Sequence, residues 1–134
     1  MADTIELEIV TPERLVVKDH AEEIQIPGRN GYLGILPGHA PLITELAVGE
    51  IVYTNAGVST HLAVAWGFAE VLPDKVTILA EAAECAGDID VPRAEAARDR
   101  AQQHLREAED SAAVEEATAA LARAEARLSV AKQQ

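Results

Sequence analysis

The run GYLGILPGHAPLIT at residues 31–44 constrains the fold of this chain more than any other stretch. It contains three glycines and two prolines, which permit positive φ angles or fix φ, so the backbone must bend at set points. The apolar side chains between these bends suit short strands around a core; they are Leu33, Ile35, Leu36, Leu42 and Ile43. His39 lies at the tip of the turn PGHAP, with no second acid, base or nucleophile nearby in sequence. The run therefore predicts a shaped structural loop and no catalytic residue.

Short strand-like segments fill the rest of residues 1–87. Ile5, Leu7 and Ile9 alternate with glutamates, which is the period of a half-buried strand. Turn residues separate the further strands that we expect at residues 15–17, 24–26, 51–54, 58–65, 68–72 and 76–83. Because aromatic residues make up only 3% of the chain, the core must be aliphatic. This pattern predicts an all-β sandwich or barrel.

Two aromatic residues in the segment Trp66-Gly67-Phe68 allow two interpretations. The first is a plug in the core, with the glycine permitting a bulge. The second is an anchor that faces a partner protein.

The composition changes after Gly87, where alanine, glutamate, arginine and glutamine replace the strand formers. Asp90 suits the N-cap of a helix over residues 91–108, and Asp110 or Ser111 that of a second helix to about residue 132. Apolar residues recur at helical spacing, at Ala94, Ala97, Ala101, Leu105 and Ala108 in the first helix and at Val114, Ala117, Leu121, Ala124, Leu128 and Ala131 in the second. Residues 88–134 are therefore predicted to form an antiparallel helical hairpin. Alanine buries little area, so we expect this hairpin to dock weakly and to move.

Charge and hydropathy exclude some classes of partner. The formal net charge of −12 on 134 residues argues against nucleic acid and against an anionic membrane surface. No apolar run approaches the roughly 20 residues of a membrane span, so we expect any membrane association to come through another protein. The four histidines show no metal-ligand spacing, and we expect no metal site.

Four arginines of the predicted hairpin lack a good carboxylate partner on their own helix. Arg100, Arg123 and Arg127 have no acid at i±3 or i±4, and Arg93 has only the capping Asp90. They need an anion from elsewhere. Carboxylates of a facing helix, an acidic partner protein and a phosphate are the three candidates.

The loop sequence, followed by Gly49, resembles the signature of the epsilon subunit of bacterial F-type ATP synthases, which is the delta subunit in mitochondria. The likeness extends over nearly the whole chain. It includes the strand-rich first part, the element IDVPRA at residues 89–94 and the two alanine-rich helices.

The resemblance implies a non-catalytic rotor subunit of the central stalk, which couples proton-driven rotation to ATP synthesis and restrains ATP hydrolysis. One face of the sandwich would pack on the gamma subunit, and the loop would face the ring of c subunits. The loop residues carried over are Gly31, Tyr32, Gly38, His39 and Pro41. An opened hairpin would contact the catalytic alpha and beta subunits through Arg123, Arg127 and Lys132. The chain would be peripheral, on the cytoplasmic side of the bacterial plasma membrane.

Some epsilon subunits bind ATP through the motif Ile/Leu-Asp-x-x-Arg-Ala, which stands here as residues 89–94. The implied regulatory ATP site comprises Glu84, Ile89, Asp90, Arg93, Ala94, Arg100, Arg123 and Arg127. No cofactor is required, and the absence of a P-loop motif argues against hydrolysis by this chain. The alternative from another class is a free-standing β-sandwich module that binds a small molecule or nucleotide without joining an assembly.

Overall fold

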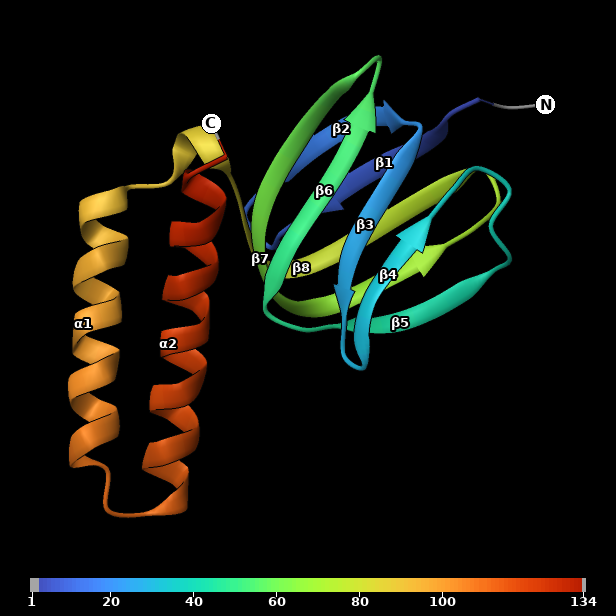
Figure 1. The fold of residues 1–134 in the computed structure, drawn as a ribbon. Helices are drawn as coiled ribbons and strands as arrows, with labels where there is room; N and C mark the ends of the chain where they lie inside the picture. Colours follow the sequence, from blue (N-terminus) through green and yellow to red (C-terminus); the bar gives the residue numbers. More distant parts are fainter. Residues whose placement is uncertain (1–2, 134) are drawn as a thin grey trace.

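The computed structural model describes residues 3–133, in which eight strands precede two helices (Figure 1). The strands form a β-sandwich, and the helices form an antiparallel hairpin beside it, which confirms the predicted fold class. The strands are β1 (Ile5–Val10), β2 (Leu15–Ala21), β3 (Glu23–Gly28), β4 (Gly31–Ile35), β5 (Leu42–Leu46), β6 (Gly49–Asn55), β7 (Val58–Val71) and β8 (Lys75–Cys85). A 3₁₀ turn, η1 (Ala86–Asp88), leads to helices α1 (Val91–Glu107) and α2 (Ser111–Ala131).

One hydrogen-bonded sheet runs through both layers of the sandwich. Its main path is β2-β1-β8-β7-β5-β3-β4, and β6 pairs with both β3 and β7. Strands β3 and β7 thus each pair with β5 over one part of their length and with β6 over another. All pairings are antiparallel except that of β1 with β8. The sheet therefore closes around its own core.

Strand β7 bends at Trp66 and Gly67, which have positive φ angles of 48° and 125°. Its pairing with β8 keeps one register across the bend, with Ala65 opposite Ala82 and Gly67 opposite Ala80. The bulge that the sequence predicts at Gly67 is therefore wrong, because neither strand gains an extra residue there. The separate strands expected at residues 58–65 and 68–72 are also wrong, because residues 58–71 form one continuous strand that stays paired with β8.

The core is aliphatic, as expected. Every second residue of β1 is fully buried, and branched side chains from the seven other strands complete the cluster. The core-plug interpretation of the aromatic pair is wrong, because Phe68 is 53% exposed and Trp66 is only half-buried. Neither ring belongs to the aliphatic core cluster.

Both helices begin where the sequence predicts. The Asp90 carboxylate accepts a hydrogen bond from the Arg93 backbone N–H (3.1 Å), and Asp110 accepts one from Ala113 (2.8 Å), which satisfies N–H groups of each first turn. No helix among the described residues is both long and apolar enough to span a membrane.

The predicted stripe of α2 is partly wrong. Ala117 and Ala124 are buried, but Val114 is 41% exposed, and the fully buried Val130 was not in the stripe. Val130 is buried because the C-terminal end of α2 packs on the sandwich, whereas Val114 lies at the far end of the hairpin (Figure 1).

A small apolar cluster joins the two parts. Its buried members are Ala63 of β7, Ile89, Ala94 of α1 and Val130 of α2. Two of these four side chains are alanine, so the cluster buries little apolar area, in line with the expectation of weak docking. Movement of the hairpin stays a prediction.

Candidate functional site

A cleft of about 640 Å³ lies where the hairpin meets the sandwich. Arg93 comes from the first turn of α1, and Arg123 and Arg127 come from successive turns of α2. Residues 81–84 of β8 and the turn at residues 11–14 form the sandwich side of the cleft.

A second cleft, of about 240 Å³, lies along the two helices. Arg100 and His104 of α1 line it, together with Arg123 and Arg127 of α2 and small alanine side chains. The two clefts share Arg123 and Arg127. The structure thus brings together all four arginines that the sequence singled out.

Arg127 finds its anion on the sandwich. Its Nε lies 2.7 Å from Oε1 of Glu84 on β8, and its Nη2 donates to Oε2 of the same carboxylate at 3.4 Å. The facing-helix carboxylate, one of the three candidate anions, is wrong for Arg127, because its counter-ion comes from a strand of the sandwich. This two-point contact ties α2 to β8.

Arg123 contacts the sandwich through an aromatic ring. Its guanidinium carbon lies 5.1 Å from the centroid of the Trp66 ring, within the range of a cation–π interaction. Sequence spacing gave no sign of this contact, because the backbone bend of β7 at Trp66 and Gly67 determines where the Trp66 ring points.

The other two arginines carry no internal counter-charge. Within residues 3–133, neither Arg93 nor Arg100 forms a salt bridge, and Arg123 has only the ring contact. Guanidinium groups in a fixed arrangement bind phosphates well. The site therefore suits an anion that can approach several arginines at once.

The three motif residues Ile89, Asp90 and Ala94 do not line either cleft. Ile89 and Ala94 are buried in the apolar cluster between the two parts, and the Asp90 carboxylate caps α1. In this structure the motif thus builds the junction and the first turn of α1, which places Arg93 at the cleft.

The predicted contact loop is held by backbone bonds. Gly31 and Gly38 have positive φ angles, the Gly38 N–H donates to the Pro73 carbonyl (2.8 Å), and the His39 N–H donates to the Leu36 carbonyl (3.1 Å). The His39 Nδ1 lies 2.6 Å from the Ala40 carbonyl, so the ring is turned to its own loop. Pro41 is exposed.

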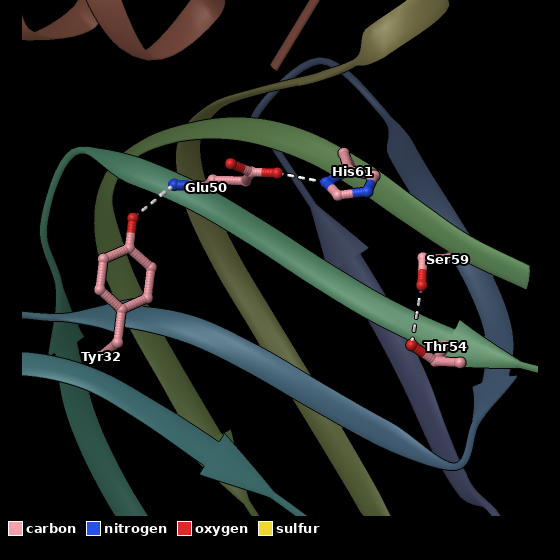
Figure 2. A network of polar contacts seen from close by, with 5 residues as sticks. All are labelled: Tyr32, Glu50, Thr54, Ser59 and His61. Atoms are coloured by element: carbon pink, nitrogen blue, oxygen red, sulfur yellow. Dashed lines mark hydrogen bonds and ion pairs between the residues drawn. The ribbon is translucent and has the colours of Figure 1, made fainter. Parts of the chain in front are cut away.

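Tyr32 braces this loop against β6. Its hydroxyl accepts a hydrogen bond from the Glu50 N–H (3.2 Å), although 55% of the residue is exposed (Figure 2). A side chain at Gly49 would meet this hydroxyl at 2.7 Å, which explains the glycine that closes the loop sequence.

Sequence reasoning missed a row of polar pairs between β6 and β7. Glu50 pairs with the His61 ring, and Thr54 pairs with Ser59 (Figure 2). The sequence contained a signal for these pairs, because the turn at Asn55-Ala56-Gly57 sets the register of β6 against β7. In that register Thr54 lies opposite Ser59, and His61 lies opposite Val52 and diagonal to Glu50.

An exposed apolar patch lies on the outer face of β5, β7 and β8. Phe68 and Leu79 are opposite each other in the pairing of β7 with β8 and are 53% and 55% exposed, and Ile43 of β5 is 72% exposed. We call these three residues the outer patch. Exposed apolar groups on neighbouring strands are typical of a protein interface.

Two family models match the chain in succession. Residues 4–86 match the beta-sandwich domain of the ATP synthase delta/epsilon chain, and residues 88–132 match the long alpha-helix domain of the same chain.

Individual ATP synthase epsilon chains are also similar to this chain. The chain is 72% identical over 105 residues to the ATP synthase epsilon chain of Koribacter versatilis, covering 78% of this chain and 74% of that one. It is 50% identical over 132 residues to the epsilon chain of Syntrophobacter fumaroxidans, with 98% of both chains covered.

A solved structure shows the same fold. A chain in the Euglena gracilis mitochondrial ATP synthase structure of OSCP, F1 and c-ring superposes with a TM-score of 0.84 at 23% identity, covering 98% of this chain and 83% of that chain. Because the family models together span both parts of the fold, the chain belongs to the ATP synthase delta/epsilon chain family, among the bacterial epsilon subunits.

Proposed function

We propose that this chain is a non-catalytic rotor subunit in the central stalk of an F-type ATP synthase, coupling proton-driven rotation to ATP synthesis. The observation that carries the proposal is the full-length match to epsilon chains together with a sandwich whose loop and outer patch are both exposed. The Tetrahymena thermophila neighbour, a central stalk and c-ring structure with a TM-score of 0.60, supports the same placement. The chain would be peripheral, on the cytoplasmic side of the plasma membrane, and attached only through the complex.

The sandwich offers two surfaces for partners. The outer patch, Ile43, Phe68 and Leu79, provides the apolar area that a stable contact with the gamma subunit needs. The loop at residues 31–44, held rigid by its backbone bonds, would meet the ring of c subunits with Tyr32, His39 and Pro41.

The hairpin would restrain ATP hydrolysis when it leaves the sandwich. Opening breaks the Arg123–Trp66 and Arg127–Glu84 contacts and frees both arginines. Together with the exposed Lys132, they would then contact an acidic segment of the beta subunits and stall rotation.

ATP would oppose this opening. Its phosphates would approach the arginines of the two clefts, and the larger of these clefts exists only while the hairpin is docked on the sandwich. A ligand that binds the docked state alone shifts the population toward that state. ATP is a regulatory ligand in this proposal and no cofactor is required.

The rotor proposal is tested by co-purification of the chain with the gamma subunit. We expect a stoichiometric complex that Phe68→Glu disrupts, with Val58→Glu as a control because Val58 is also exposed (65%) but lies at the β6–β7 turn. Failure of the unmodified chain to bind gamma would favour a free-standing binding module.

The nucleotide proposal is tested by calorimetric titration of the chain with ATP. We expect heat that Arg93→Ala and Arg100→Ala each reduce, with Arg98→Ala as the matched control because Arg98 pairs with Asp99 on the same helix. No heat at millimolar ATP would refute nucleotide binding and leave the rotor proposal intact.

A further inference from the structure

One arginine that lines the cleft between the sandwich and the hairpin belongs neither to the motif at residues 89–94 nor to the helices. Arg14 lies in the turn between β1 and β2 and lines the same cleft as Arg93, Arg123 and Arg127. It is the one arginine of the cleft that the sandwich supplies.

The backbone fixes the position of Arg14. The Thr11 N–H donates to the Arg14 carbonyl (2.9 Å), and the Arg14 N–H donates to the Thr11 hydroxyl oxygen (3.4 Å). Thr11 is only 8% exposed, so the turn is anchored in the domain. These bonds use main-chain atoms of residue 14, so a change of its side chain leaves them in place.

The charges in the cleft leave Arg14 without an internal counter-ion. It forms no salt bridge within the described part of the chain. The carboxylates lining the cleft are Glu13, Glu81 and Glu84, and Glu84 already binds Arg127. Three arginines then face two free glutamates, which leaves donors available to an incoming anion.

The charge of Arg14 also affects the pKa of Cys85, the thiol at the end of β8. Burial raises the pKa of Cys85 and Asp88 raises it further, whereas Arg14 lowers it.

We propose that Arg14 is a phosphate-binding residue of this cleft, so that a bound polyphosphate chain contacts the sandwich and the hairpin at once. The inference rests on the proposed nucleotide site and adds a residue to it. The polyphosphate could belong to a nucleoside triphosphate or be free in solution. A ligand held by both domains stabilises the docked hairpin more than one held by the helices alone.

The test is calorimetric titration of the full chain with ATP and, separately, with inorganic tripolyphosphate. Arg14→Glu is compared with Lys18→Glu, which makes the same change in charge at an exposed residue of β2 that lies outside the cleft. We expect Arg14→Glu to weaken binding of both probes about five- to tenfold, the size for reversing a partly exposed cation, while Lys18→Glu stays within about twofold of the unmodified chain. Arg14→Lys should restore most of the affinity.

Each other outcome is decisive. If Arg93→Ala weakens binding and Arg14→Glu does not, this inference fails and the nucleotide site stands. If Arg14→Glu weakens ATP but not tripolyphosphate, Arg14 contacts the base or ribose, and its phosphate role is wrong. If the unmodified chain binds neither probe, both this inference and the nucleotide site are refuted. Tripolyphosphate binding without ATP binding would identify free polyphosphate as the ligand, and its loss in Arg14→Glu would support Arg14 as its contact, whereas unchanged binding would refute that role.

Discussion

The guanidinium of Arg123 on α2 stands over the ring of Trp66 on β7, with 5.1 Å between its central carbon and the ring centroid. Trp66 and Gly67 both have positive φ angles, so the bend of β7 at these two residues presents the ring to the helix. A local irregularity of one domain thereby becomes a contact surface for the other.

We predict that Trp66→Leu loosens the hairpin without unfolding the sandwich. A cation–π contact at a half-exposed site is worth about 0.5–1 kcal/mol, so opening of the hairpin should become about two- to fivefold more frequent. Amide hydrogen exchange of α2 measures this opening. Phe68→Leu is the control, because Phe68 is exposed on the outer patch. If the α2 amides exchange equally fast in both variants, the Trp66 ring does not contribute to docking of the hairpin.

We predict that Glu84→Gln also weakens docking, and that the effect depends on salt. The Arg127–Glu84 pair is partly exposed, with side chains 22% and 36% accessible, so its contribution is about 0.5–1 kcal/mol and falls as ionic strength rises. Exchange of α2 amides at low and high sodium chloride provides the measurement. Glu45→Gln, which removes the Arg29 ion pair elsewhere on the sandwich, should leave exchange of α2 unchanged.

Val130 should contribute more to docking than either polar contact. It is fully buried in the cluster with Ala63, Ile89 and Ala94, so Val130→Ala removes two buried methyl groups and should cost about 1–2 kcal/mol of docking free energy. Val114→Ala removes the same groups from an exposed site on the same helix and should have little effect. Similar exchange rates for the two variants would contradict the assignment of Val130 as the main docking residue.

Gly67→Ala should destabilise the sandwich strongly. A Cβ at this position would lie 1.9 Å from the Leu79 carbonyl oxygen, and the φ angle of 125° is one that side chains rarely adopt. We expect a loss of about 2–4 kcal/mol in the free energy of unfolding, measured by urea denaturation. Gly87→Ala is the control, since a Cβ there meets nothing within 4 Å. A loss as small as that of the control would mean that β7 and β8 can move apart at Gly67 without a cost in stability.

Local patterns predicted the parts of this fold that local chemistry determines. Alternation identified β1, and the two capping aspartates placed both helix starts, because each depends on neighbours within a few residues. The arginines lacking partners at helical spacing were also correctly singled out as a group, and the structure gathers them around two clefts.

Patterns within one segment of the sequence could not predict contacts between elements that are far apart in the chain. The burial of Val130 and the pairing of Arg127 with Glu84 both depend on how the hairpin lies against β7 and β8, which no spacing within α2 encodes. The Glu50–His61 pair is intermediate, because it depends on the register of one hairpin whose turn is visible in the sequence.

The parallel pairing of β1 with β8 sets the order in which the chain can assemble. Glu6 lies opposite Lys75, and the pairing ends with Val10 opposite Leu79, so one edge of β1 is unpaired until almost seventy further residues exist, although β2 can pair with its other edge early. Contacts so distant in sequence make folding slow and expose β1 during synthesis. The helices follow β8 directly, and the surface that receives Val130 exists only once β7 and β8 are in place. We therefore expect docking of the hairpin to be the last step of folding and its undocking to be the first step of unfolding.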